Sequence, residues 1–202
     1  MSAQSLTSPT PLATALWPTG ADSNTQAMLR FVALTIIGAA LLAISAKIRV
    51  PFFPVPMTLQ TFAIMGLGAA YGMRLGLATV LLYLAIGALG MDVFTSSTAD
   101  NNGLSYMLGS TGGYLVGFII AMGIIGYFAE RGWDRSPFKL FGLMLGADAL
   151  IFALGLLWLG TIAGWDKPIL QWGLYPFIAG DLVKIALAAA VIPAIWGWMK
   201  RR

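Results

Sequence analysis

The chain has 202 residues, of which 58% are hydrophobic and only 10% are charged, whereas soluble domains have about 25% charged residues. It has no cysteine and no histidine, and Glu130 is its only glutamate, which argues against thiolate nucleophiles, imidazole acid–base catalysis, haem ligation and typical zinc sites. The Lys and Arg residues behind the net charge of +4 are scattered along the chain, a pattern that argues against nucleic-acid binding.

The N-terminal region, residues 1–27, is rich in Ser, Thr, Pro and Ala and shows no helical periodicity. It has no basic segment followed by an apolar core, so it does not resemble a signal peptide. We therefore expect a disordered tail on the cytoplasmic side.

Six apolar segments follow, each close to the roughly 17–25 residues that a membrane-spanning helix needs. They cover residues 28–46, 57–73, 75–91, 107–129, 139–163 and 173–199. This pattern predicts an all-α integral membrane protein with six transmembrane helices in one domain, residues 28–202. Only Gly72, Arg74 and Gly76 separate the second segment from the third, so one broken, re-entrant element is the alternative there.

The distribution of basic residues predicts the orientation. With six spans, both termini lie on the same side of the membrane. If that side is the cytoplasm, eight Lys and Arg residues lie inside and three lie outside, as the positive-inside rule requires. The inside set is Arg30, Arg74, Arg131, Arg135, Lys139, Lys200, Arg201 and Arg202, and the outside set is Lys47, Arg49 and Lys167.

The loop between the first two expected spans, residues 47–57, holds three prolines among apolar residues. Proline removes a backbone donor and restricts the residue before it, so this loop cannot form a regular helix. We expect a stiff, extended segment that is suited to be a lid, with plain connectivity as the alternative.

A second outer loop runs from Asp92 to Ser110 and leads into a glycine-rich start of the fourth span. There Gly113 permits close backbone approach, and the hydroxyls of Thr111 and Tyr114 lie beside it. This loop too has plain connectivity as its alternative.

The last span contains an acid and a base three residues apart, Asp181 and Lys184, which therefore share one helix face. Each charge within a span costs about 2.5–3.5 kcal/mol on the insertion scale, so such residues usually face a polar cavity or a partner. We expect them to line a ligand pocket, Lys184 facing an anionic group and Asp181 accepting from N–H donors. A purely structural pair is the alternative. Asp148, a second intramembrane carboxylate, either faces the same cavity or lies near the inner boundary.

Four stretches resemble the BioY family of biotin transporters, the substrate-binding S components of energy-coupling factor (ECF) transporters. They are Val-Pro-Met-Thr-Leu-Gln-Thr at 55–61, residues 83–94, Gly-Ser-Thr-Gly-Gly-Tyr-Leu-Val-Gly-Phe at 109–118, and Pro-Phe-Ile-Ala-Gly-Asp-Leu-Val-Lys at 176–184. The resemblance implies an S-component-like bundle in the bacterial cytoplasmic membrane, with a biotin site near the outer face. The implied partners are a transmembrane coupling protein and ABC ATPases. The resemblance further implies that this chain is not an enzyme and holds no cofactor. The sequence contains no phosphate-binding loop of the Gly-xxxx-Gly-Lys-Ser/Thr type, so only the partner ATPases would use ATP.

The resemblance also implies site residues. Besides Asp181 and Lys184, the expected biotin-binding set is Gln60, Tyr83, Asn102, Thr111, Gly113, Tyr114, Asp148 and Phe177. Ala39 and Ala43 fit the small-residue pattern by which such S components dock, with helix packing inside the chain as the alternative.

Two positions depart from the family, since Ser110 and Asp92 stand where proline is usual. The loop after Asp92 also differs, which leaves Asn101 and Asn102 both open as the ligand-contacting asparagine. Two alternatives for the function stay open: an S component that binds another small vitamin, and an intramembrane enzyme that uses Asp148 with Asp181. In the absence of partner proteins, the chain could also form a homo-oligomer.

Overall fold

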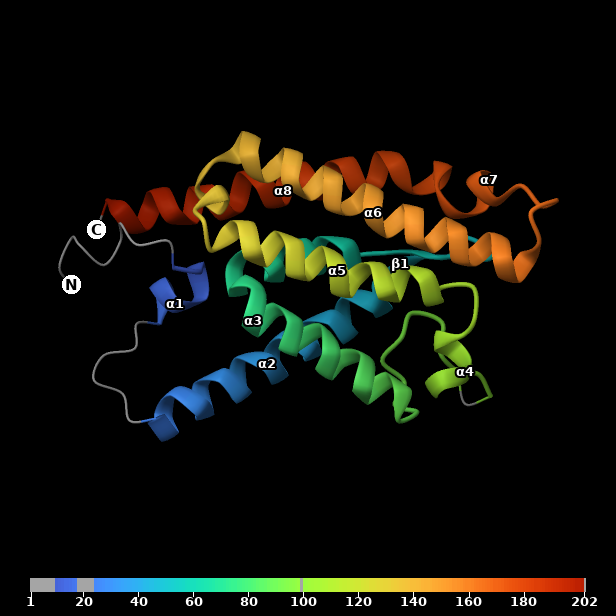
Figure 1. The fold of residues 1–202 in the computed structure, drawn as a ribbon, viewed down its shortest axis with the longest axis horizontal. Coiled ribbons are helices and arrows are strands. Elements are labelled where there is room, and N and C mark those ends of the chain that lie inside the picture. The colour runs from blue at the N-terminus through green and yellow to red at the C-terminus, as the bar shows by residue number, and fades with distance from the viewer. Residues whose placement is uncertain (1–9, 18–23, 99, 202) are drawn as a thin grey trace.

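The structure is a computed structural model that describes residues 10–17, 24–98 and 100–201. Figure 1 shows an elongated helical bundle in which α6 and α8 run along one long side and α2 lies on the opposite side. In chain order the elements are α1 (Leu12–Leu16), α2 (Asn24–Lys47), β1 (Arg49–Val50), β2 (Met57–Thr58), α3 (Gln60–Ala88), α4 (Gly103–Met107), α5 (Gly112–Ala129), the 3₁₀ helix η2 (Trp133–Arg135), α6 (Pro137–Ala163), α7 (Ile169–Gly173) and α8 (Tyr175–Lys200).

Five helical segments in the described part of the chain are long and apolar enough to cross a membrane: α2, α3, α5, α6 and the α7–α8 segment. Their outer surfaces are apolar. On α2, for example, Ile36, Ile37 and Ile44 are each about half exposed (50–59%). A soluble protein rarely exposes such a continuous apolar surface, so lipid is its natural solvent. The prediction of an all-α membrane protein is confirmed, and the structure contains five such segments where six separate helices were expected.

The difference in number arises at α3, which contains both the second and the third expected span. The backbone at Gly72 is non-helical, with φ 76° and ψ −177°, and the chain folds back there into two arms, residues 60–71 and 73–88. The side chains of Gln60 and Tyr83 are hydrogen-bonded at 2.8 Å, whereas 23 residues of straight helix would separate them by about 35 Å. Figure 1 shows the two arms diverging from a turn near α1.

Close contacts explain why this turn needs glycine. The backbone N–H of Met73, which begins the second arm, donates to Glu130 Oε1 at 2.9 Å. A Cβ atom at Gly72 would lie 2.6 Å from that same oxygen. On the other side, a Cβ at Gly126 would lie 2.5 Å from the carbonyl carbon of Gly72. The only glutamate of the chain therefore caps the second arm, and α5 packs directly against the turn.

The N-terminal region differs in part from the expected disordered tail over residues 1–27. Residues 12–16 form α1, whose Leu12 is 3% exposed, and the ring of Pro11 lies against the Gly72 turn. The helix α2 begins at Asn24, four residues before the expected start. Burial of Leu12 gives α1 a reason to be ordered that composition does not reveal. The rest of the expected tail, residues 1–9 and 18–23, lies outside the described residues.

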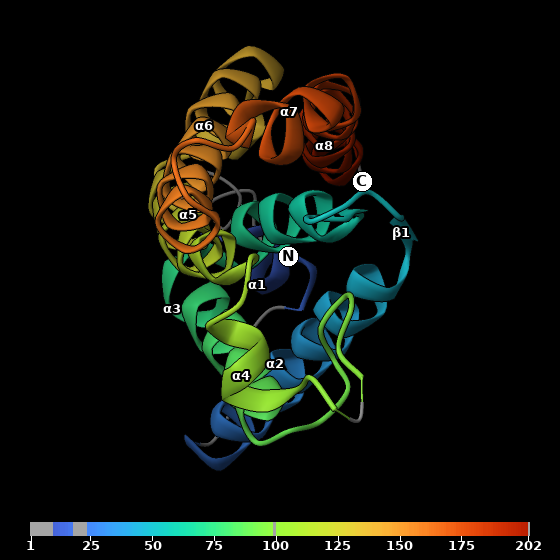
Figure 2. The same ribbon diagram turned by 90° about the vertical axis from the view of Figure 1, so that its right-hand side faces the viewer.

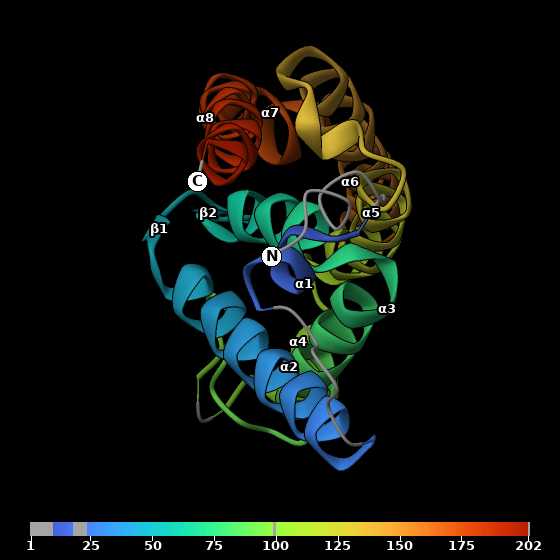
Figure 3. The same cartoon turned by 90° about the vertical axis from the view of Figure 1, so that its left-hand side faces the viewer.

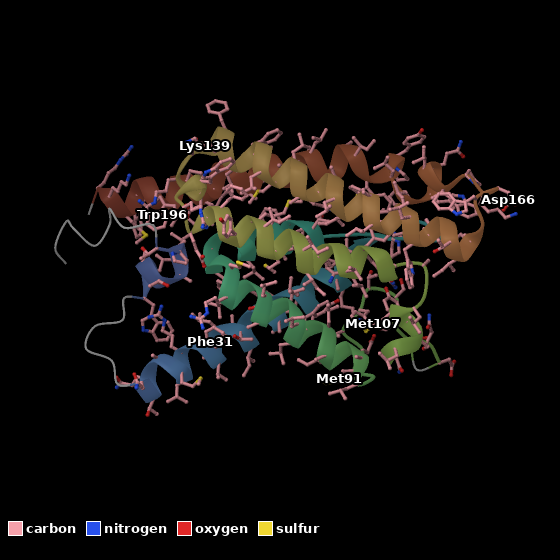
Figure 4. The ribbon with its side chains drawn as sticks, viewed as in Figure 1. Phe31, Met91, Met107, Lys139, Asp166 and Trp196 are labelled. Atoms are coloured by element: carbon pink, nitrogen blue, oxygen red, sulfur yellow. The ribbon has the colours of Figure 1, made fainter. Side chains whose placement is uncertain are left out.

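The bundle has two distinct ends. Figure 2 looks onto the end formed by α4, α7 and β1, which we call the α4–α7 end, and Figure 3 looks onto the opposite end, the α1 end. Figure 4 places Asp166 at the first, and Lys139 and Trp196 toward the second. At the α1 end, Trp196 Nε1 donates to the buried Asp134 Oδ2 at 2.5 Å. Burial raises the pKa of Asp134 to about 6.

Candidate functional site

A cavity opens within the α4–α7 end of the bundle. Protein atoms leave about 550 Å³ of space unfilled there, part of it continuous with solvent. The lining comes from the β1–β2 region, the first arm of α3, the 94–95 loop, α4, α5, α6 and α8. The lining residues are Val55, Pro56, Thr58, Gln60, Thr61, Phe94, Thr95, Tyr106, Thr111, Tyr114, Leu115, Phe118, Ile151, Phe152, Phe177, Asp181 and Lys184.

The charged pair of α8 lies in this cavity and is almost completely buried. The side chains of Asp181 and Lys184 are 2% and 14% exposed. Lys184 Nζ donates to Asp181 Oδ1 at 2.7 Å, to the Thr58 carbonyl at 2.6 Å and to Thr61 Oγ1 at 3.1 Å. An ammonium has three protons, so all three are committed.

The two oxygens of Asp181 differ. Oδ1 accepts from Lys184 and also from the Thr61 hydroxyl, at 2.8 Å. Oδ2 is buried and has no hydrogen-bond partner among the described residues. A buried carboxylate oxygen without a donor is costly, so Oδ2 is an unused acceptor on a residue that lines the cavity.

Aromatic rings form the apolar wall of the cavity. The ring centroid of Phe152 lies 5.8 Å from that of Phe177 and 6.1 Å from that of Tyr114. The Tyr114 hydroxyl donates to the Gly173 carbonyl at 2.9 Å, which satisfies its polar group away from the cavity. The wall therefore offers flat apolar surface beside a single charged cluster.

The proline-containing segment of residues 51–56, which we call the cover segment, lies over this cavity. It joins β1 to β2, which pair antiparallel with Arg49 opposite Thr58 and Val50 opposite Met57. Val55 is 4% exposed and lines the cavity together with Pro56. The cover segment is not helical, as the prolines predict.

Hydrogen bonds connect the cover segment and its base to neighbouring loops. Ser110 Oγ donates to the Pro54 carbonyl at 3.2 Å. Lys47 Nζ donates to Asp92 Oδ1 at 2.6 Å, and this bond lowers the pKa of Asp92 below its usual value. Arg49 donates to Ser96 Oγ at 2.7 Å. Ser110 and Asp92, the two departures from the family pattern, thus both make contacts that a proline could not make.

Six of the ten predicted ligand residues line the cavity. They are Gln60, Thr111, Tyr114, Phe177, Asp181 and Lys184.

Three of the other predicted ligand residues lie close to the cavity without lining it. Tyr83 is 1% exposed, and its hydroxyl accepts from Gln60 Nε2 and donates to the Val93 carbonyl at 3.3 Å. Gly113 lies against the Leu154 carbonyl of α6, where a side chain would collide with the backbone. Asn102 precedes α4, where its carbonyl accepts from Ser105 Oγ at 2.7 Å. These residues support the site's framework, since they fix Gln60, the α5–α6 contact and α4.

Asp148, the fourth, lies on α6 one turn from the cavity residues Ile151 and Phe152. It is 6% exposed, and its Oδ1 is buried without a hydrogen-bond partner among the described residues. It lies close enough to Asp181 and Lys184 to interact with both electrostatically. Asp148 therefore neighbours the charged cluster from the side of α6.

The sequence prediction omitted several lining residues, of which Thr61 is the most informative. Its hydroxyl contacts both members of the charged pair. It lies one residue after Gln60, in a stretch already singled out by the family resemblance. The residues Phe94, Tyr106 and Phe152 lay outside any polar pattern, and aromatic residues are too common in membrane helices to mark a site alone.

Gly38 and Ala39 of α2 face the bundle. Ala39 is 3% exposed, Ala43 is partly buried, and a Cβ at Gly38 would lie 2.6 Å from the Thr79 methyl group on α3. These observations favour the packing interpretation for Ala39, because a covered residue cannot contact a partner in this structure.

The comparisons with known proteins agree with one another. The model of the BioY family matches residues 19–201. A probable biotin transporter BioY from Pyrococcus horikoshii is 36% identical over 82% of this chain and 96% of its own length. A biotin transporter BioY from Thermotoga maritima is 33% identical over 77% and 89%. A 2.1 Å crystal structure of the S component for biotin from an ECF-type ABC transporter matches with a TM-score of 0.72 and 25% identity, over 86% of this chain and 94% of that one. On these matches, the chain belongs to the BioY family.

Proposed function

We propose that this chain captures biotin in the cavity at the α4–α7 end, as the substrate-binding S component of an ECF-type ABC transporter. It is a transporter component and not an enzyme. The observation that carries the proposal is the buried cluster of Asp181, Lys184 and Thr61, which places one unpartnered carboxylate oxygen beside an ammonium in a cavity with a largely apolar, partly aromatic lining.

The chemistry of biotin suits this cluster. Its ureido ring has N–H donors next to a carbonyl acceptor, and Asp181 Oδ2 and Lys184 offer an acceptor next to a donor. Because Asp181 and Lys184 are in direct contact, the same end of the ligand must meet both, and we assign that end to the ureido ring. Its carbonyl takes one of the three Lys184 protons, most simply the one now held by the Thr58 carbonyl. The apolar ring and chain then lie along Phe152, Phe177 and Tyr114.

We further propose six membrane crossings, with each arm of α3 crossing once and both termini in the cytoplasm. The basic residues support this topology. Arg30, Arg74 and Lys139 lie near helix starts or turns at the α1 end. At the α4–α7 end, Lys47 is the last residue of α2, Arg49 lies in β1, and Lys167 lies in the loop between α6 and α7. The positive-inside rule then places the α1 end in the cytoplasm. The cover segment faces the outside of the cytoplasmic membrane, where biotin enters once this segment moves.

Partners are needed to supply energy, and we propose a transmembrane coupling protein and ABC ATPases that dock from the α1 end. Ala43 is the better candidate for a docking contact, since Ala39 is covered by α3. Ala43→Leu is expected to lower biotin uptake in cells that contain the coupling subunits while leaving biotin binding by the purified chain unchanged. Ala40→Leu, on the exposed side of α2, is the matched control. Equal uptake by both variants would remove the docking role of Ala43.

One titration tests the central proposal. The purified protein in detergent is titrated with biotin and, separately, with other small vitamins. We expect saturable binding of biotin and of none of the others. A protein that ignored biotin but bound another vitamin would be an S component of different specificity, and the assignment to biotin would be wrong.

A further inference from the structure

Asp148 is a buried acid to which the binding site described above gives no task. It is 6% exposed, in the middle of an apolar helix, and its Oδ1 has no hydrogen-bond donor among the described residues. An ionised carboxylate in such a place must be neutralised, solvated or protonated. The surroundings of Asp148 decide between these outcomes.

Neutralisation of Asp148 by a salt bridge would require a cation. Lys184 is the cation that interacts with Asp148, but its three protons are already committed to Asp181, the Thr58 carbonyl and Thr61. The cluster thus contains two carboxylates and one ammonium. If both acids are ionised, its net charge is −1 inside the bundle.

No other charged group of the neighbouring helices compensates this excess. In the described part of the chain, α5 carries no charged residue, and neither does α7. The 3₁₀ helix η2 and the turn of α3 carry charges only at the α1 end. The titratable groups on α6 and around it are Lys139 near the start of α6, Tyr175, Asp181, Lys184 and Lys200 on α8, Tyr114 and Tyr127 on α5, Asp134 and Arg135 on η2, and Tyr71, Arg74 and Tyr83 on α3, which packs on α5 and α8.

Ligand binding makes the excess larger. Biotin is an anion at neutral pH, and its apolar atoms replace water in the cavity one helix turn from Asp148, which lowers the polarity around this acid. Both effects disfavour the ionised form of the acid. The simplest compensation is a proton from solvent, which forms an O–H bond at the unpartnered Oδ1 and reduces the charge of the cluster by one.

We propose that Asp148 is a proton-binding residue of the site, so that capture of the anionic vitamin is coupled to proton uptake at its carboxylate. This inference rests on the proposed function, because it needs biotin as the ligand. It assigns to Asp148 a role through charge, without direct contact with the ligand.

Isothermal titration calorimetry measures this coupling. Biotin is titrated into the purified full chain between about pH 6 and pH 9, at each pH in phosphate and in Tris, which differ strongly in ionisation enthalpy. We expect the binding enthalpy of the wild type to differ between the two buffers over part of this range. The sign of the difference should show that the protein takes up a proton, which the buffer releases, when biotin binds. Over the same range the apparent Kd rises with pH, by at most about tenfold per pH unit for one linked proton.

Asp148→Asn is expected to bind biotin with the same enthalpy in both buffers and with a Kd that no longer follows pH. Asp166→Asn, which changes an exposed acid paired with Lys167, is the matched control and keeps the wild-type behaviour. Asp148→Glu retains a carboxyl group and keeps the proton uptake.

The outcomes separate the two proposals. A wild type that binds biotin with equal enthalpies in both buffers at every pH overturns the inference, whatever the variants do. The same holds if Asp148→Asn keeps the buffer dependence. A wild type that binds no biotin contradicts the proposed function itself.

Discussion

The Asp181–Lys184 pair has two possible roles, and a double-mutant cycle distinguishes them. In one, the pair contacts the ligand. In the other, the two residues only neutralise one another inside α8. Both roles predict that a single substitution harms the protein, because removal of one partner of a buried pair costs about 3–5 kcal/mol and leaves the other charge unpaired. Single variants are therefore uninformative by themselves.

The double variant separates the two roles. Asp181→Ala removes the unpartnered oxygen, and Lys184→Met removes the ammonium but keeps most of the apolar stem. If each group donates or accepts one charge-assisted hydrogen bond to biotin, each single change costs about 1.5–3 kcal/mol of binding free energy. This corresponds to a roughly 10- to 150-fold rise in Kd. The double variant has lost both hydrogen bonds to biotin, so its Kd is at least as high as that of whichever single variant binds biotin less tightly.

The assay is titration of each purified variant with biotin, with the thermal unfolding midpoint recorded in parallel. The midpoint reports the cost of the unpaired charge to stability, which the double variant should largely recover because it buries no unpaired charge. We therefore expect stability to return in the double variant and binding not to return. A double variant that bound biotin within about threefold of the wild type would refute the reasoning, since the pair would then be structural only.

Three further predictions concern single contacts. Thr61→Val removes the hydroxyl that contacts both charged groups and should weaken biotin binding about tenfold or more, measured by the same titration, whereas the control Thr161→Val, at an exposed position, should not. Gly72→Ala forces a side chain onto a backbone with φ 76° and should cost about 2 kcal/mol, a fall of roughly 4–8 °C in the thermal midpoint; Gly66→Ala, where a Cβ meets nothing within 4 Å, should be nearly neutral, and equal midpoints would contradict the strained turn. The pKa of Asp134 is raised from 3.8 to about 6 in the folded protein, so the unfolded chain releases this proton more readily and wild-type stability falls as pH rises from about 4 to about 6, then levels off. Asp134→Asn, whose carbonyl can still accept from Trp196, should remove this loss and raise the midpoint at pH 7.5 but not at pH 4, for a gain of up to about 3 kcal/mol; a variant less stable than the wild type at pH 7.5 would show that the hydrogen bond outweighs the burial of the acid.

The membrane class was predictable from the sequence because it depends on the length of apolar runs, which is a property of the chain alone. The contact between Asp181 and Lys184 was predictable for a similar reason, since a spacing of three residues places them on one helix face wherever that helix packs. The break at Gly72 was also visible, although the sequence could not distinguish two separate helices from one helix folded back on itself. That choice depends on Glu130, which caps the second arm from 57 positions away.

What the sequence could not give is the rotation of each helix against its neighbours. Asp148 and Phe152 are four residues apart on α6, yet only Phe152 lines the cavity, and this difference arises from the packing of α6 on α5 and α8. Tyr83 has the residue type of a ligand contact but lies behind Gln60. The formation of α1 could not be predicted from the sequence either, since its one buried leucine packs on a surface that exists only once α3 has folded back.

The strengths of the contacts around the cavity also indicate which part of the site moves. The charged cluster is buried, and its groups hold one another by hydrogen bonds that are costly to leave unmade. The contacts that tie the cover segment and its base to the neighbouring loops are of another kind. The Lys47–Asp92 pair is 40% and 66% exposed, and exposed ion pairs contribute about 0–1 kcal/mol, while the Ser110–Pro54 bond joins two partly buried groups at 3.2 Å. Water can replace each of these contacts as it breaks, so the cover segment can lift while the cluster keeps its geometry. Movement of the cover segment would therefore take Val55 and Pro56 away from the cavity but leave Asp181, Lys184 and Thr61 in place, which is the arrangement that a binding protein needs if it is to open without losing its charged cluster.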